Sequence, residues 1–331
     1  MSISLVILFA FCISVGSSLK PTVFPSKSFN VTKDVNVLHN AMKGIGTDEG
    51  AIINILTKRS MNQRLRIAEI YSYQRAKSLD FVSQLKDELS GDFKKLVVAL
   101  MTPPLVYYAE EMHDAMDGLG TDEDAIVEIL CTLNNNEIKE MTTFYENLYS
   151  RSLKSDIQDD TSSDFQELLL SLLMANREIE NKVENDAAVS DAWSFSGYYE
   201  EQWIPKEIIF KNIICYRSYP QLRQTFIEFF NLCNYDIEKR IQEMGFSRDF
   251  EKGLLQIVKR AKSKSGFFAD RLYNNMNDPR TLTRIIVSRS EIDLGDIKQE
   301  FKKRYGKELE TLIHENTSGD YRDCLLALVS T

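Results

Sequence analysis

The chain has 331 residues, of which 43% are hydrophobic and 27% are charged, and its formal net charge is -9 at pH 7. This is the composition of a globular protein with ample material for a buried core. A negative surface is repelled by phosphate, so the charge argues against binding to nucleic acid, and against an anionic membrane unless a bound cation bridges the two.

The chain begins with an apolar run from Ile3 to Val15, which gives way to small residues that include Gly16 and Ser18. The run is shorter than the roughly 20 apolar residues that span a bilayer, and this pattern is typical of a secretory signal. We expect residues 1–18 to be a cleaved signal peptide and the protein to be secreted or held at an extracellular membrane surface. Because no Lys or Arg precedes the run, the alternative is a cytoplasmic, peripheral membrane protein.

A short tail over residues 19–32 follows, and it contains one of two acceptor sequons for N-glycosylation, at Asn30; the other is at Asn316. Loss of the signal would remove Cys12 and leave four cysteines, all within apolar runs. These are Cys131, Cys215, Cys233 and Cys324. Buried free cysteine behaves as a small hydrophobic residue, so we favour unpaired thiols over disulfides.

A serine, any residue, an aspartate and an aromatic ring precede an apolar run four times along the chain. The copies begin at Ser90, Ser162, Ser247 and Ser318. Apolar residues recur at steps of three and four with few β-branched alternations, which predicts several short amphipathic helices per copy and an all-α fold.

The copies divide the chain into four units. These are repeat 1 over 33–103, repeat 2 over 104–176, a linker with repeat 3 over 177–262, and repeat 4 over 263–331. The interval between the second and third copies is the longest, and its excess falls on residues 176–191. We interpret this charged stretch as a connector between two halves, the first part of which could be helical, so that the architecture is two pairs of repeats.

Two units contain the strongest local match in the chain. Residues 41–49 read Ala-Met-Lys-Gly-Ile-Gly-Thr-Asp-Glu, and residues 115–123 read Ala-Met-Asp-Gly-Leu-Gly-Thr-Asp-Glu. One interpretation is a plain turn, because glycine can end one helix while threonine and aspartate cap the next. The other is a metal site, because a glycine loop exposes carbonyl oxygens and calcium takes six to eight oxygens from carbonyls, carboxylates and water. Glu88 and Asp160 could each add the carboxylate.

A glycine loop followed about forty residues later by an acid resembles the annexin repeat, and the resemblance covers nearly everything from Lys33 to the C terminus. It implies four repeats of about five helices each, arranged as two pairs in a slightly curved disc. It also implies Ca2+ as the bound ion, with a lipid phosphate or water completing its coordination. The implied ligands are Met42, Gly44, Gly46 and Glu88 in repeat 1, and Met116, Gly118, Gly120 and Asp160 in repeat 2.

The other two repeats depart from this pattern. Residues 195–203 lack the Gly-x-Gly-Thr sequence, residues 274–279 form a shorter segment, and the acid position of repeat 4 holds Asn316. We therefore expect no calcium site of this type in repeats 3 and 4. Exposed aromatic residues of repeat 3 could still reach a bilayer interface, although packing in the core is the simpler interpretation. They are Tyr198, Tyr199 and Trp203.

These features predict reversible, calcium-dependent docking on, or bridging of, acidic phospholipid membranes. With one carboxylate per site the protein alone should hold calcium weakly, so calcium and lipid would strengthen each other's binding. The alternative is an extracellular structural or adhesion protein with protein or sulfated glycan partners, motivated by the basic run from Lys259 to Lys264. The oligomeric state stays open. The three histidines stand in no catalytic motif, so we expect no enzymatic activity.

Overall fold

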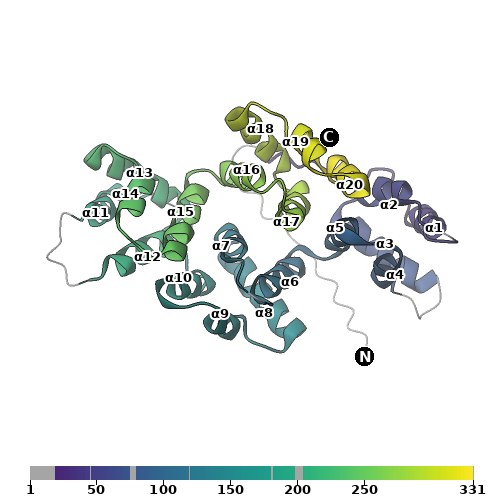
Figure 1. Cartoon of the computed structure of the whole chain (residues 1–331), viewed down its shortest axis with the longest axis horizontal. Coiled ribbons are helices and arrows are strands. Elements are labelled where there is room, and N and C mark those ends of the chain that lie inside the picture. Colours follow the sequence, from purple (N-terminus) through teal and green to yellow (C-terminus); the bar gives the residue numbers. More distant parts are fainter. Residues whose placement is uncertain are drawn as a thin grey trace.

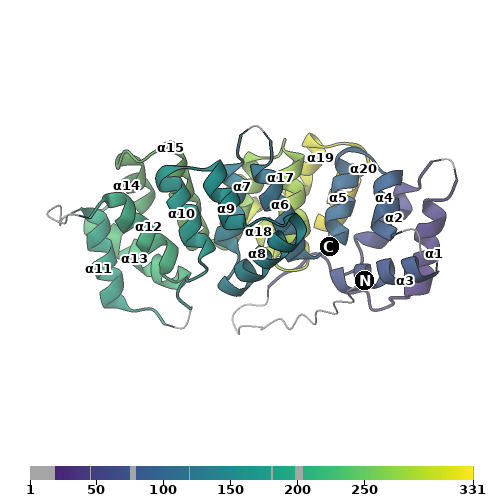
Figure 2. The same ribbon diagram turned by 90° about the horizontal axis from the view of Figure 1, so that it is seen from below.

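The structure is a computed structural model that describes residues 19–44, 46–74, 80–118, 120–179, 182–197 and 204–330. Within these ranges it contains twenty helices and no strand, which confirms the all-α prediction. The helices form an elongated, slightly curved plate (Figures 1 and 2). The proposed signal peptide, with Cys12, lies outside the described residues. In the ranges that the structure describes, no helix is both long and apolar enough to cross a bilayer.

The first two repeats each contain five helices. Those of repeat 1 are α1 (Val31–Ala41), α2 (Glu49–Leu56), α3 (Met61–Gln74), α4 (Phe81–Glu88) and α5 (Gly91–Met101). Those of repeat 2 are α6 (Pro104–Met116), α7 (Glu123–Thr132), α8 (Asn135–Tyr149), α9 (Leu153–Asp160) and α10 (Ser163–Leu173).

The last two repeats follow the same order. Repeat 3 contains α11 (Asn185–Ser196), α12 (Lys206–Tyr216), α13 (Tyr219–Cys233), α14 (Ile237–Glu243) and α15 (Arg248–Lys262). Repeat 4 contains α16 (Lys264–Asn274), α17 (Pro279–Ser290), α18 (Leu294–Tyr305), α19 (Leu309–Asn316) and α20 (Gly319–Val329).

The recurring Ser-x-Asp-aromatic sequence begins the fifth helix of every repeat. Its serine is the extended N-cap residue of α5, α10, α15 and α20. Its aromatic ring is buried in each case, at Phe93, Phe165, Phe250 and Tyr321. The repeated sequence therefore marks where each repeat turns its last helix back onto its own core.

The repeats pair in space as first with fourth and second with third. Helix α5 packs against α17 and α20, and α10 packs against α12 and α15 (Figure 1). Two pairs are present as expected, but they are not the two sequential halves that the connector suggested, because the partner of repeat 1 is repeat 4 and the partner of repeat 2 is repeat 3. As a result, each pair contains one of the two glycine loops.

The connector between repeats 2 and 3 differs from the prediction in one respect. Its first part, over residues 176–179 and 182–184, is not helical, and the first helix after it begins at Asn185. Its backbone bonds to other helices instead: the amide of Glu178 donates to the Tyr216 carbonyl at 2.7 Å, and Asn135 Nδ2 donates to the Arg177 carbonyl at 2.8 Å. These tertiary hydrogen bonds satisfy backbone groups that a helix would otherwise pair internally.

The N-terminal tail ties repeat 4 to repeat 1. The Gly295 amide donates to the Lys20 carbonyl at 2.7 Å, and the Thr22 amide donates to the Ser290 carbonyl at 2.8 Å. Further along, the Ser26 amide donates to Gln63 Oε1 of α3 at 2.9 Å. The tail is therefore held from Lys20 to Ser26 by hydrogen bonds.

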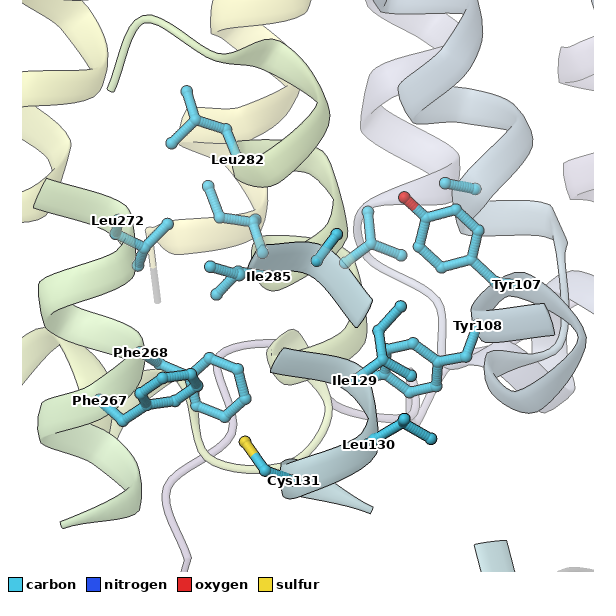
Figure 3. Packing of buried hydrophobic residues seen from close by; sticks show 14 of the residues in the cluster. Tyr107, Tyr108, Ile129, Leu130, Cys131, Phe267, Phe268, Leu272, Leu282 and Ile285 are labelled. Carbon is cyan, nitrogen blue, oxygen red and sulfur yellow. The ribbon is translucent and has the colours of Figure 1, made fainter. Parts of the chain in front are cut away.

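An apolar layer joins repeats 2 and 4 at the middle of the molecule. Side chains from α6 and α7 point toward those from α16 and α17 (Figure 3). The labelled members are all buried: Tyr107, Tyr108, Ile129, Leu130, Cys131, Phe267, Phe268, Leu272, Leu282 and Ile285. Burial of this many large side chains is the main stabilising contribution at this junction.

A buried ionic network crosses the same junction. The fully buried Arg284 of α17 donates to Glu128 Oε1 at 2.8 Å and to Glu111 Oε2 at 3.0 Å. Arg271 of α16 donates to Glu128 Oε2 at 2.8 Å. Burial by itself would raise the pKa of Glu128, but the two guanidinium groups hold that pKa below its ordinary value. Two arginines of repeat 4 therefore stabilise the buried negative charge of Glu128.

The cysteines confirm the expectation of unpaired thiols. Cys131, Cys215 and Cys324 are buried, Cys233 is half-buried, and all four are free. Burial raises the pKa of both Cys131 and Cys215 to about 12. Such thiols are inert, and they contribute as core residues.

Candidate calcium sites

The glycine loop of repeat 1 lies between α1 and α2. Gly44 has φ of 110° and Gly46 has φ of 87°, in a region that L side chains rarely adopt. The amide of Asp48 donates back to the Ala41 carbonyl at 2.8 Å, which closes the loop. The Asp48 side chain then caps α2 by accepting from the Ala51 amide at 2.9 Å.

The loop of repeat 2, between α6 and α7, adopts the same conformation. Gly118 has φ of 106° and Gly120 has φ of 90°. The amide of Asp122 donates to the Ala115 carbonyl at 2.8 Å, and its side chain accepts from the Ala125 amide at 3.0 Å. The capping interpretation of the sequence is therefore correct for the aspartate of each loop, and it leaves the glycine segments themselves free for another role.

The structure brings the predicted distant acid to each loop. Glu88 is the last residue of α4, and Asp160 is the last residue of α9. Thr121 Oγ1 donates to Asp160 Oδ2 at 2.6 Å, and Thr47 Oγ1 donates to Glu88 Oε2 at 3.4 Å. These two threonines are positioning residues that the sequence analysis missed. The signal was present, because each one is followed by its acid at nearly the same interval.

The donor set of each loop fits a hard cation such as calcium. No atom of the described residues lies within 4 Å of where a side chain would begin on any of the four glycines, so the loops face open space. Among the described residues, no hydrogen bond engages the carbonyl oxygens of the predicted ligands, which are Met42, Gly44 and Gly46, and Met116, Gly118 and Gly120. Three carbonyls and one carboxylate would leave coordination positions for lipid phosphate or water.

This donor set has few titratable side chains. Across the described ranges, no group of three or more His, Cys, Asp or Glu side chains could hold a metal ion. A site of the predicted kind needs only one, because backbone carbonyls supply the other protein ligands. We therefore expect modest affinity for calcium from the protein alone.

Repeat 3 has an acid in the equivalent place but a different local environment. Glu243 is the last residue of α14, as Glu88 is of α4. The ammonium group of Lys206, the first residue of α12, donates to the Met244 carbonyl and lies 5.2 Å from the centre of the Phe246 ring. The Lys206 ammonium group therefore lies at the C-terminal end of α14. The aromatic residues Tyr198, Tyr199 and Trp203 lie outside the described residues.

Repeat 4 has neither a glycine loop nor an acid. Only residues 275–278 separate α16 from α17, whereas residues 42–48 separate α1 from α2. Asn316, the last residue of α19, donates through Nδ2 to the Leu312 carbonyl of its own helix at 2.8 Å. A neutral amide engaged in this way is a poor substitute for a bidentate carboxylate.

The basic run before repeat 4 is largely engaged within the fold. Lys262 Nζ lies 2.6 Å from Asp236 Oδ1 and 2.8 Å from Glu238 Oε1. The Arg260 guanidinium stacks 3.6 Å from the centre of the Tyr219 ring. Burial, with the nearby Arg289, lowers the pKa of Lys264 to about 7. These interactions favour a structural role for the run over an open glycan-binding patch.

Replacing Gly120 with alanine should weaken calcium binding at the second loop and lower global stability only by the strain at that residue. The added Cβ meets open space, so the penalty is the backbone strain of a φ near 90°, about 1–2 kcal/mol. Gly306→Ala is the matched control, because Gly306 also has positive φ but ends α18. Calcium titration and thermal melts should separate the two variants. Equal calcium affinity in Gly120→Ala and the parent protein would contradict a role for this loop.

Comparison with known proteins follows the same four-part division. The family model described as Annexin matches residues 33–100, 107–172, 200–257 and 267–328. The chain is 42% identical to annexin A13 of Mus musculus over 305 residues, covering 91% of this chain and 95% of that protein. It is 44% identical to annexin A8 of Homo sapiens over 315 residues, covering 94% and 95%.

Solved structures agree with the sequence relatives. The structure of annexin III superposes with a TM-score of 0.90 at 40% identity, covering 96% of this chain and 99% of that one. A calcium-bound structure of annexin (Sm)1 superposes with a TM-score of 0.82 at 30% identity, covering 95% and 94%. The similarity therefore extends over the whole four-repeat plate.

Proposed function

Because the chain belongs to the annexin family, we propose that it docks reversibly on acidic phospholipid membranes and that calcium bound in repeats 1 and 2 makes the contact. The family supports calcium-dependent phospholipid binding in general. One observation carries the proposal for this chain: two glycine loops share the same backbone conformation, and each has a carboxylate held beside it by a threonine.

The arrangement of the loops suits one flat target. Both the α1–α2 loop and the α6–α7 loop project from the same broad face of the plate, which is uppermost in Figure 2. Calcium would supply positive charge between an acidic protein and an anionic surface. The protein contributes carbonyl and carboxylate oxygens on a rigid helical frame, and lipid phosphate completes the coordination. Binding of ion and lipid would then be mutually reinforcing, and removal of calcium would release the protein.

We also propose that the protein docks without catalysing a reaction. Its proposed target is the lipid surface rather than a glycan. The engaged side chains of the basic run support the second point.

Cosedimentation with vesicles tests the docking proposal. The chain from Leu19 onward should pellet with phosphatidylserine vesicles in calcium and stay in the supernatant with chelator. It should not pellet with pure phosphatidylcholine vesicles. Pelleting that is equal with calcium and with chelator would contradict the proposal, as would none at millimolar calcium.

We further propose that the protein is exported and acts at the outer surface of a cell. The apolar run before Gly16 and Ser18 supports this. Weak calcium sites would stay loaded outside the cell, so the protein would act as a standing adhesive. Amino-terminal sequencing of the protein from culture medium should find Leu19 first. Retention in the cytoplasm with an intact N terminus would contradict export.

A further inference from the structure

A cavity of about 260 Å³ lies where repeats 2, 3 and 4 meet, between α7, α15 and α16. Its wall includes Asp124, at the start of α7, and Asn274, the last residue of α16. Asp124 follows Gly120 of the second glycine loop by four residues, so the cavity lies beside that loop. It is small for a drug-sized or nucleotide ligand and suits a group of headgroup size.

The charges around the cavity are unevenly paired. Its two carboxylates are both engaged: Asp124 Oδ2 lies 3.1 Å from Arg271 NH1, and Asp270 Oδ2 lies 2.9 Å from Arg304 NH1. Lys252 and Lys259 also line it, and neither has an ion pair among the residues that the structure describes. The cavity therefore offers two uncommitted ammonium groups to a ligand.

The two lysines can act on the same anion. They lie seven residues apart on α15, which is two turns and about 10 Å along the axis on one side of the helix. Lysine carries its charge on a flexible four-carbon stem, so both ammonium groups can approach a phosphate placed between them.

Gln256 has a side-chain oxygen that lacks a hydrogen-bond donor in the described structure. It stands on α15 between the two lysines, and its Nε2 donates to Asp124 Oδ1 at 2.7 Å. This fixes the amide so that Oε1, which is buried, is left without a hydrogen-bond partner in the described structure. A buried acceptor without a donor is costly, and a ligand hydroxyl would satisfy it.

From these features we propose that the cavity binds a phosphate monoester that also carries a hydroxyl group. The phosphate lies between Lys252 and Lys259, and the hydroxyl donates to Gln256 Oε1. Such a group is found in the headgroups of phosphoinositides and in soluble polyol phosphates. The choice of a lipid source rests on the proposed membrane function, whereas the phosphate chemistry does not.

Calorimetric titration with glycerol 3-phosphate in the presence of chelator tests the cavity itself. The full chain should bind it, and Lys252→Gln with Lys259→Gln should weaken binding at least tenfold. Lys139→Gln with Lys154→Gln is the control, because both lysines are exposed, lie on α8 and α9, and make the same charge change. Failure of the parent chain to bind, or equal weakening in the control, would overturn the proposal.

Methyl phosphate, which lacks a carbon-borne hydroxyl, tests the assignment of Gln256. Gln256→Leu should weaken glycerol 3-phosphate binding severalfold and leave methyl phosphate binding unchanged. Equal losses for both probes would overturn the hydroxyl assignment.

Vesicles identify the source of the phosphate. With phosphatidylcholine vesicles containing phosphatidylinositol 4-phosphate, the double lysine variant should pellet less than the parent chain in chelator, while its calcium-dependent pelleting with phosphatidylserine is retained. Unchanged pelleting with phosphatidylinositol 4-phosphate, alongside lost binding of glycerol 3-phosphate, supports the cavity and assigns it to a soluble ester. Absence of phosphatidylserine pelleting in the parent chain would sink the docking function and leave the cavity result intact.

Discussion

Replacing Asp160 with asparagine should raise the calcium concentration for half-maximal binding to phosphatidylserine vesicles on the order of tenfold or more. Asp160 Oδ2 accepts a hydrogen bond from the second loop's threonine, Thr121, at 2.6 Å. An amide offers one neutral oxygen where a bidentate charge is needed. Glu88→Gln should have a similar effect at the first loop, and the two changes together should abolish docking, because no other repeat has both a glycine loop and an acid.

Neighbouring acids provide matched controls. Asp159 is exposed and 3.3 Å from Arg151, and Asp87 is exposed next to Glu88. Changing either to asparagine makes a comparable charge change without touching a loop, so calcium dependence should be preserved. Docking by the Glu88→Gln, Asp160→Asn protein at the parent calcium concentration would mean that another part of the surface makes the contact.

Replacing Arg284 with alanine should destabilise the protein by about 3–5 kcal/mol, because two buried carboxylates lose their shared partner. Glu111 and Glu128 would remain in the junction of repeats 2 and 4 with reduced compensation. Arg280→Ala is the control, since Arg280 contacts Glu111 from a partly exposed position and should cost far less. Thermal melts should give the lowest midpoint for Arg284→Ala, a higher one for Arg280→Ala and the highest for the parent chain. Equal melting midpoints for Arg284→Ala and Arg280→Ala would contradict the importance of the buried network.

The same network predicts a direction of pH dependence. The folded-state pKa of Glu128 is held below its ordinary value, so its stabilising contribution is present above the unfolded value of about 4.3. That contribution is lost as the pH falls through the lower folded-state pKa. The stability difference between the parent chain and Arg284→Ala should therefore be largest near neutral pH and shrink in acid.

Much of this fold could be predicted from short-range features of the sequence. The Ser-x-Asp-aromatic sequences begin the fifth helices at Ser90 and its three counterparts, because an extended serine before a buried ring is a local requirement of the turn. The pairing of repeat 1 with repeat 4 could not be predicted, because it depends on surfaces of α5, α17 and α20 that meet only in three dimensions. The sequence allowed a helix in the first part of the connector after residue 176, but this part is not helical, since distant groups such as the Tyr216 carbonyl take its amides.

The candidate sites could also be predicted only in part. Their glycines and acids could be predicted from the spacing in the sequence, because a fixed number of helical residues returns Glu88 and Asp160 to their own loops. The sequence also indicated that repeat 3 lacks the loop, but not that Lys206 would reach the end of α14. Nor could it show that Asp124 holds Gln256 between two lysines that have no ion pair in the described ranges, because Asp124 belongs to repeat 2 and the other three residues to repeat 3.

Diffraction from crystals grown with calcium would test most directly whether the two glycine loops bind the ion. We expect one ion at residues 42–46 with Glu88 and one at residues 116–120 with Asp160, and no ion between α16 and α17 or at Asn316. An ion bound by repeat 4, or glycine loops that stay free of calcium at concentrations where the protein docks on membranes, would contradict it.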